Sequence, residues 1–197
     1  SGNIALPQTP LNDRSDVPSI AFTNQVIKDN AEWKKTIHAY YAEVSKMDNQ
    51  LGYVLDELDR QNLWSNTIVV FWSDHGQHLG EHEGLWLKNT LFKESIEVPM
   101  IVCVPGKPAG VCSKLVELVD LYPTLTELCS LPEQSGIEGS SFVKLFDNPA
   151  NEWKRAVFSQ VKRSGGPIMG RSVRTAQYHY NSWETYGEEL YDIASDP

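Results

Sequence analysis

The chain has 197 residues and a formal net charge of −9, with 41% hydrophobic and 22% charged residues. This composition is typical of a globular chain that is long enough to bury a core. The acidic balance argues against nucleic acid and anionic membrane surfaces as partners, and no apolar run approaches the roughly 18 residues of a membrane span. Ser1-Gly2-Asn3 lacks the basic and apolar regions of a signal peptide.

The first segments are predicted to be an extended arm followed by a long helix. Residues 1–28 are rich in Pro, Asn and Asp, which favours an arm without regular structure. Over residues 30–61, apolar side chains recur at steps of three and four, which predicts one amphipathic helix capped by Asp29 or Asn30. His38, near the helix start, is interpreted as a surface or packing residue. The apolar stripe consists of Ile37, Tyr40, Tyr41, Val44, Met47, Leu51, Val54, Leu55 and Leu58.

The most informative stretch begins with a continuous apolar segment, residues 67–72, which predicts a strand buried on both faces in a parallel sheet. Asp74 and His75 follow at its carboxyl end, where open α/β sheets bind their ligands, and Gly76 then allows a sharp turn. A carboxylate and an imidazole suit a divalent cation: Ca²⁺, Mg²⁺ or Mn²⁺ where oxygen dominates, and Zn²⁺ where imidazole does. In the structural alternative, Asp74 caps the turn and His75 is a hydrogen-bonded core residue.

The following segments continue an α/β pattern. Residues 100–104 predict another buried strand, and residues 115–119 are a further candidate strand. Asp120 is suited to cap a helix that ends near residue 128, and a short helix is expected around residues 142–146. Residues 1–150 are therefore assigned to an α/β domain with a mostly parallel sheet flanked by helices.

The pattern changes near residue 154 to short apolar runs separated by turns, which predict a small antiparallel subdomain over residues 151–197. His179 is interpreted as a surface residue. The predicted strands are residues 156–159, 171–175, 178–180 and 189–192.

Three cysteines are present, and none forms a C-x-x-C pair typical of a metal site. Cys103 lies in an apolar strand and is predicted to be a buried thiol. A disulfide between Cys112 and Cys129 is left open, because sequence does not supply the geometry.

Four motifs in residues 73–106 resemble the type I sulfatases of the alkaline phosphatase superfamily, in particular the iduronate-sulfatase-like branch. They are Ser-Asp-His-Gly, Leu-Gly-Glu-His, Leu-Trp-x-Lys-x-Thr-Leu-Phe-x-Glu-Ser and Val-Pro-Met-Ile-Val-x-Val-Pro-Gly. Asp-Leu-Tyr-Pro-Thr-Leu, Arg-Ser-Val-Arg-Thr and Glu-Leu-Tyr-Asp-Ile-Ala-Ser-Asp-Pro extend the resemblance toward the C-terminus. The fold that the resemblance implies is alkaline-phosphatase-like.

The resemblance also implies roles for individual residues. Asp74 and His75 would bind Ca²⁺, with Mn²⁺ or Zn²⁺ as alternatives, and Lys88 would be the catalytic residue that contacts the sulfate. His82 is a candidate for substrate binding or for a general acid; the alternative is that it orients the loop or contacts a carboxylate such as Glu81. The family pattern runs Gly-Glu-His-Gly into the Trp and Lys, so Glu83 is an extra residue here.

The nucleophile of the type I sulfatases is a formylglycine made from the first residue of a C/S-x-P-S-R motif, and this chain has no such motif. Cys103-Val104-Pro105-Gly106-Lys107 lacks the Ser and the Arg and is rejected. In the family, the nucleophile, the tandem Asp metal ligands and a further histidine precede the segment present here. We therefore expect the C-terminal portion of a sulfatase, inactive alone, that completes its site with the N-terminal half of the same protein.

The expected reaction is metal-dependent hydrolysis of a sulfate monoester on a small molecule or glycan. Two alternatives stay open: a phosphodiesterase or phosphonate monoester hydrolase of the same superfamily, and a non-catalytic carbohydrate-binding remnant. The natural substrate and the compartment are not readable, although the family is usually periplasmic, secreted or lysosomal.

Overall fold

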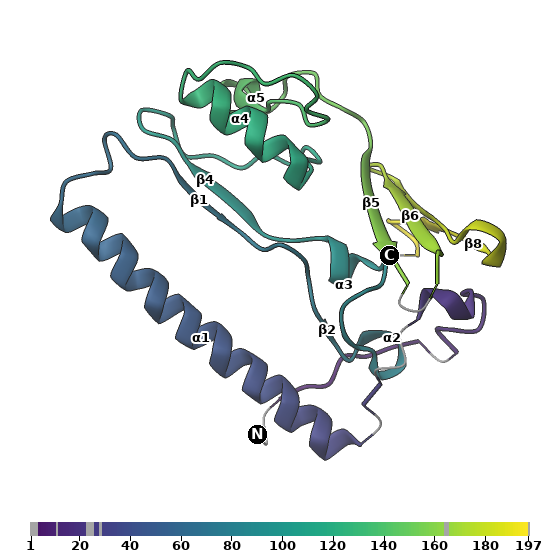
Figure 1. The fold of residues 1–197 in the computed structure, drawn as a ribbon. Helices are drawn as coiled ribbons and strands as arrows, with labels where there is room; N and C mark the ends of the chain where they lie inside the picture. Colours follow the sequence, from purple (N-terminus) through teal and green to yellow (C-terminus); the bar gives the residue numbers. More distant parts are fainter. Residues whose placement is uncertain (1–3, 11, 23–25, 28, 164–165, 197) are drawn as a thin grey trace. The chain divides into compact units, whose positions relative to one another are not determined.

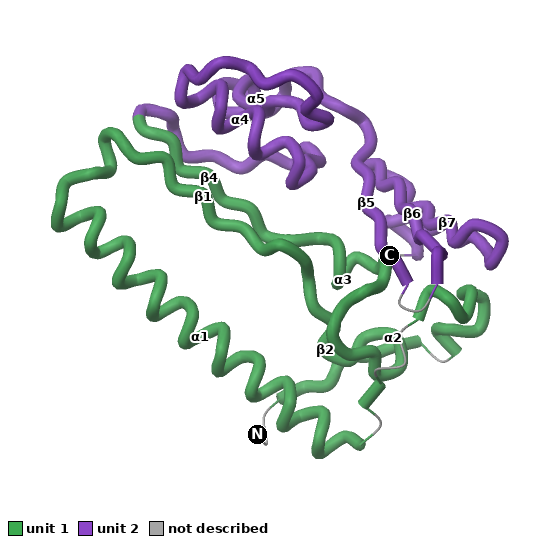
Figure 2. Tube along the Cα trace, viewed as in Figure 1, with its two compact units in different colours: residues 1–105 green, residues 106–197 purple. Residues whose placement is uncertain are grey.

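The computed structural model describes residues 4–10, 12–22, 26–27, 29–163 and 166–196. The chain forms two compact units, residues 1–105 and 106–197, which are considered separately (Figures 1 and 2). The predicted boundary between residues 150 and 151 refers to the intact sulfatase and stays a prediction. None of the helices in these ranges combines the length and the apolar character that crossing a membrane requires.

The long helix of the first unit matches its prediction. Helix α1 spans Asn30–Arg60 (Figure 1). The Asp29 side chain caps it by accepting a hydrogen bond from the backbone N–H of Glu32 at 2.8 Å. The stripe is only partly covered: Ile37 is 2% exposed, whereas Tyr41 is 53% exposed. Tyr40, Val44, Met47 and Val54 are also exposed.

The central strands differ from their prediction in direction. Strand β1 (Val69–Trp72) pairs with β4 (Met100–Cys103) in antiparallel register, and the predicted mostly parallel sheet is absent from the described residues. The intervening segment closes on itself at the carboxyl end of β1, because the Gly76 N–H donates to the Ser95 carbonyl at 2.8 Å. The chain therefore re-enters beside the end that it left, which produces an antiparallel pair.

The same pair of strands corrects the prediction for Cys103. Alternate residues of β4 are exposed in this two-stranded sheet, so Cys103 is exposed and not a buried thiol. Cys112 and Cys129 are also free and exposed, and they form no disulfide with each other.

Four short elements and part of the arm surround the carboxyl end of β1. They are β2 (His78–Leu79), α2 (Glu81–Gly84), β3 (Trp86–Leu87) and α3 (Lys93–Ile96), with β2 and β3 antiparallel. The described part of the arm contains a 3-10 helix, η1 (Ser19–Ala21), and pairs with this region through a bridge between Val26 and Leu85. The segment from β2 to α3 is called the site loop below.

The candidate strand over residues 115–119 is not formed in the second unit. Residues 115–117 are not in a strand, and η2 (Leu118–Asp120) follows because the Asp120 carboxylate accepts the Glu117 backbone N–H at 2.9 Å. Helix α4 (Leu121–Leu128) comes next, and α5 (Val143–Asp147) follows later. Asp120 precedes α4 as predicted, but its side chain does not cap that helix.

The four C-terminal strands confirm the predicted antiparallel sheet. They are β5 (Val157–Lys162), β6 (Met169–Arg174), β7 (Tyr178–Ser182) and β8 (Glu188–Asp192), in the order β5-β6-β7-β8. The last two are connected through η3 (Glu184–Tyr186).

The buried face of this sheet is polar, which corrects the surface prediction for His179. That residue is 5% exposed, and its Nε2 lies 2.8 Å from the Ser172 hydroxyl on the neighbouring strand. Trp183 is fully buried and donates from its indole to Glu189 at 2.6 Å. Gly170 is required under this indole, because a Cβ there would lie 2.4 Å from the ring.

Candidate active site

Asp74 and His75 lie immediately beyond the end of β1, as predicted. The His75 backbone N–H donates to Asp74 Oδ1 at 3.0 Å, and Asp74 Oδ2 lies 3.4 Å from His75 Nε2. The Asp74 side chain is 82% exposed and that of His75 is 37% exposed. A carboxylate oxygen and an imidazole nitrogen thus approach one point that is open to solvent.

The orientation of the His75 ring is set by the next residue. His75 Nδ1 lies 2.9 Å from the Gly76 carbonyl oxygen, which can only accept, so Nδ1 carries the proton. The lone pair of Nε2 therefore points outward. Lys88 Nζ donates to this same Nε2. The structure thus brings together three of the four predicted site residues, Asp74, His75 and Lys88.

Lys88 is carried by a backbone with unusual dihedral angles. Leu87 and Asn89, on either side of it, have φ values of 70° and 74°, and His82 and Glu83 lie at 51° and 58°. Non-glycine residues rarely occupy this left-handed region, and such strain is often found at functional sites. Glu83, which the resemblance marks as an extra residue, has one of these left-handed backbone angles.

Gly76 is needed for a different reason from the sharp turn that was expected. A Cβ at this position would lie 1.9 Å from the Glu94 carbonyl oxygen. The backbone of the Asp-His-Gly segment therefore packs directly against α3, and only glycine permits that approach.

His82 contacts two carboxylates. Its Nδ1 donates to Asp13 Oδ2 at 2.8 Å, its Nε2 lies 3.4 Å from Glu94 Oε2, and its ring stacks on Phe92. Burial acts to lower the pKa of His82, but the carboxylates of Glu94 and Asp13 outweigh burial and raise it. Burial likewise acts to raise the pKa of Glu94, and its hydrogen bonds from His82 and from a backbone N–H lower it. His82 therefore joins the arm to α3.

Glu81 contacts His78 and not His82. His78 is fully buried, with Nδ1 3.8 Å from Glu81 Oε2, and the Leu79 N–H donates to the same carboxylate at 2.7 Å. Burial acts to raise the pKa of Glu81, but the nearby His78 ring and the hydrogen bonds from the backbone lower it. Glu81 thus stabilises the start of the site loop.

The donor chemistry at the end of β1 fits a divalent cation in part. Asp74 supplies an anionic oxygen and His75 an unprotonated Nε2, which are suitable ligands. Ca²⁺ takes about six to eight ligands, and no group of three or more His, Cys, Asp or Glu side chains suited to a metal occurs within the described ranges. Two ligands are therefore available from these residues.

Sequence reasoning missed the residues that hold the site loop from outside. The Trp33 indole donates to the Leu79 carbonyl at 2.5 Å, which attaches α1 to the loop. Asp13 lies in the arm, and no pattern in the sequence distinguishes it from neighbouring polar residues. Glu94 was within a recognised motif, but its contact with His82 depends on the fold.

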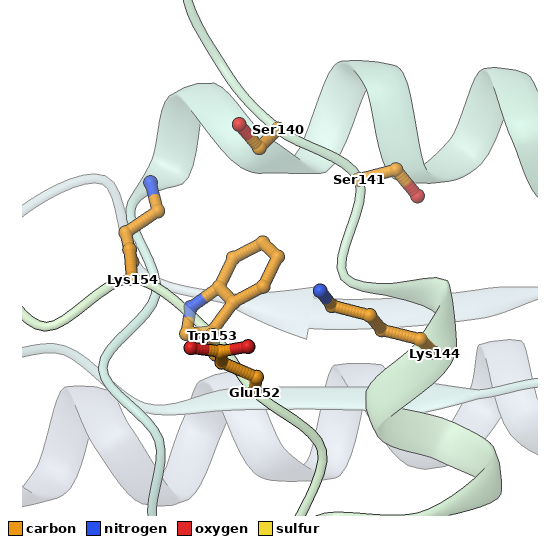
Figure 3. Close-up of a pocket in the computed structure, with 6 residues that line it drawn as sticks. All are labelled: Ser140, Ser141, Lys144, Glu152, Trp153 and Lys154. Carbon is orange, nitrogen blue, oxygen red and sulfur yellow. The ribbon is translucent and has the colours of Figure 1, made fainter.

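The second unit contains a separate pocket of ≈ 390 Å³ beside Trp153 (Figure 3). The indole is fixed by donating to the Leu115 carbonyl at 2.7 Å. Lys154 lies 2.8 Å from Asp120 and also pairs with Glu117; burial acts to lower its pKa, and these two carboxylates raise it. These residues therefore stabilise the unit. The pocket is lined by Ser140, Ser141, Lys144, Glu152, Trp153 and Lys154.

Comparison with known families identifies the family of the chain. The sulfatase family profile matches residues 9–131, and that of the N-sulphoglucosamine sulphohydrolase C-terminal region matches residues 80–197. The chain belongs to the sulfatase family.

Among individual relatives, a sulfatase of Formosa agariphila is 36% identical over 186 residues, which covers 93% of this chain and 35% of that protein. Iduronate 2-sulfatase of Mus musculus is 28% identical, covering 97% of this chain and 48% of that protein. The chain thus spans about a third to a half of the length of these relatives.

Solved structures show the same fold. A 2-O GAG sulfatase has a TM-score of 0.80 at 25% identity, covering 98% of this chain and 46% of that one. The phosphonate monoester hydrolase of Agrobacterium radiobacter has a TM-score of 0.77 at 24% identity, covering 86% of this chain and 37% of that one, a similarity of fold alone.

Proposed function

We propose that the intact protein containing this chain is a sulfuric ester hydrolase that cleaves a sulfate monoester with the help of Ca²⁺. The observation that carries the proposal is the meeting of Asp74, His75 and Lys88 at the end of β1 in a chain of the sulfatase family. The nucleophile, a formylglycine, would come from residues outside this chain, as would the remaining metal ligands.

Each of the three residues has a distinct task. Asp74 and His75 would hold the cation, which supplies Lewis acidity at the sulfate oxygens. Lys88 would neutralise negative charge on the sulfate or the leaving oxygen, a positioning role that needs no proton transfer. Substrate contact by His82 stays a prediction, since its two nitrogens face Asp13 and Glu94 in this structure.

The proposed substrate is a sulfated sugar. Relatives and neighbours support this class by their names, which include iduronate 2-sulfatase, an ulvan-active sulfatase and an enzyme in complex with D-glucosamine-2-N,6-O-disulfate. The sugar and the position of the sulfate are not specified by the residues of this chain.

The test uses the intact protein co-expressed with a formylglycine-generating enzyme. Turnover of an aryl sulfate is compared with that of an aryl phosphonate monoester, with and without added Ca²⁺. We expect Ca²⁺-dependent sulfate hydrolysis that falls about 10²- to 10³-fold in Lys88→Ala, the usual loss when one charge-stabilising donor is removed. Lys93→Ala is the control, because Lys93 is exposed at the start of α3.

Other outcomes would change the assignment. Preference for the phosphonate with a transition metal would move the protein to the phosphonate monoester hydrolases. If neither ester is cleaved and sulfated oligosaccharides are bound but not hydrolysed, the protein is a carbohydrate-binding remnant. We also expect the 197-residue chain alone to be inactive, and turnover by it would contradict the need for an external nucleophile.

A further inference from the structure

Three buried polar side chains, those of His78, Thr90 and Ser95, are linked by hydrogen bonds and are called the buried chain below. His78 is fully buried, and its Nε2 lies 2.8 Å from Thr90 Oγ1. The Thr90 hydroxyl, 2% exposed, donates to Ser95 Oγ at 2.8 Å. Nε2 of His78, the Thr90 hydroxyl and the Ser95 hydroxyl thus form one hydrogen-bonded series. His78 lies in β2, Thr90 lies between β3 and α3, and Ser95 lies in α3.

This buried chain reaches His75 through the backbone of Ser95. The Ser95 carbonyl accepts the Gly76 N–H at 2.8 Å, and the Gly76 carbonyl accepts from His75 Nδ1 at 2.9 Å. The position of α3 therefore decides where the Gly76 carbonyl points. That carbonyl in turn selects the tautomer of His75 whose Nε2 carries the lone pair that accepts from Lys88.

The same buried chain reaches Lys88 through the main chain. Thr90 is two residues beyond Lys88, and Asn89 between them has a left-handed φ of 74°. A buried, hydrogen-bonded Thr90 therefore anchors the strained backbone from which Lys88 extends. Leu91 and Phe92, which follow, are 1% and 5% exposed and bury the next part of the loop.

We propose that His78, Thr90 and Ser95 are positioning residues that set the His75 tautomer and the place of Lys88 beside it. The proposal rests on the proposed function for the roles of His75 and Lys88. The hydrogen bonds that link the three residues to them do not depend on that function. No covalent step is assigned to the three residues, and none of them contacts a reacting atom. Their removal should affect affinity for the cation and turnover more than it affects folding.

The test removes only the hydroxyl of Thr90, the middle residue of the three. Thr90→Val in the intact protein conserves volume, and Thr90→Ser restores the hydroxyl. Thr126→Val is the matched control, since Thr126 is 8% exposed and its hydroxyl donates within α4, to the Tyr122 carbonyl at 2.9 Å. The measurements are Ca²⁺ affinity by calorimetry, kcat and KM for the sulfate ester, thermal unfolding, and ¹⁵N spectra of the His75 imidazole.

We expect Thr90→Val to weaken Ca²⁺ binding or lower kcat by about 10- to 100-fold, as is usual when a group that orients a metal ligand is lost. The His75 spectrum should change from a single Nδ1–H tautomer to a mixture, and Thr90→Ser should restore both properties. Thr126→Val should change neither. If Thr90→Val fails to fold, Ser95→Ala removes the end of the same buried chain and is measured in the same way.

Two results separate this proposal from the proposed function. Unchanged affinity, kcat and His75 spectrum in a folded Thr90→Val or Ser95→Ala would overturn the positioning role, even if the wild type hydrolyses sulfate. If the wild type cleaves no sulfate ester but the His75 spectrum still responds to Thr90→Val, the positioning role is supported while the proposed function fails.

Discussion

Lys88 donates a hydrogen bond to Nε2 of His75, although the two residues are thirteen positions apart in the chain. The contact exists because Leu87 and Asn89 both adopt left-handed backbone angles and return the loop toward the end of β1. A positive group and an unprotonated imidazole nitrogen thus lie side by side near the Asp74 carboxylate. Asp74, His75 and Lys88 therefore have separate expected roles, which single substitutions can measure.

Metal affinity should depend on both ligands, and more on the carboxylate. Asp74→Ala in the intact protein removes a charged oxygen ligand and should weaken Ca²⁺ binding by more than about tenfold. His75→Ala should weaken it less, because water can take the place of the nitrogen. Calorimetric titration measures both, with the exposed Asp56→Ala on α1 as the control. Equal affinity in Asp74→Ala and the wild type would remove Asp74 from the metal site.

The His82 cluster should make stability depend on pH. A raised pKa means that the folded state binds the proton more tightly, so the contribution of His82 is complete below its ordinary value of about 6.5. That contribution is lost as pH rises through the folded-state pKa. The lowered pKa of Glu94 acts in the opposite direction, with its contribution lost as pH falls through that pKa. Stability should therefore decrease as pH rises above about 6.5 and through the raised folded-state pKa of His82.

The variant that tests this is His82→Asn, because asparagine tolerates the left-handed φ of 51° at this position. Urea unfolding at several pH values should show a smaller loss of stability on the alkaline side than in the wild type. His38→Asn on the exposed face of α1 should keep the wild-type dependence. Parallel curves for His82→Asn and the wild type would contradict the role of the cluster.

Two glycines of the first unit should respond in opposite directions to the same substitution. A Cβ at Gly80 would lie 1.6 Å from the Trp33 ring, and Gly80 has a φ of 115°. Gly80→Ala should therefore destabilise the protein by about 2 kcal/mol or more through strain and displacement of Trp33.

Gly52 lies within α1, and a Cβ at this position would meet no atom within 4 Å. Gly52→Ala should stabilise the protein by about 0.5 to 1 kcal/mol, because alanine is the better helix former. Urea unfolding of both variants gives the comparison. A neutral Gly80→Ala would show that the Trp33 contact with the loop is dispensable.

The second unit should depend on the pairing of Lys154 with Asp120. Asp120 is fully buried and accepts from Lys154 and from the Ser140 N–H at 2.8 Å. Lys154→Met leaves that carboxylate without its cation and should cost about 3 kcal/mol. Lys46→Met is the control, since the exposed pair of Lys46 with Glu43 contributes less than about 1 kcal/mol. Similar losses in the two variants would argue against the buried pair as a stabilising contact.

The sequence determined those features that local patterns encode. Helix α1 and its Asp29 cap followed from apolar spacing and from a side chain one turn away. The four C-terminal strands followed from short runs and turns, and the motifs around Asp74 identified the sulfatase family. Hydrogen bonds and periodicities of this kind involve residues within a few positions of each other, so they can be read directly.

Tertiary structure alone decided what depends on partners distant in the chain. The mostly parallel sheet is absent from the described residues, where β1 pairs with β4 in antiparallel direction. An apolar run specifies burial but not the direction of the neighbouring strand. His179 was placed at the surface, yet Ser172 on the adjacent strand satisfies its ring in the interior. The way in which the site loop folds likewise brings Lys88 to His75. It also places His82 in contact with the carboxylates of Asp13 and Glu94. Such contacts are fixed by packing and by strained backbone angles, and neither is encoded in residue spacing.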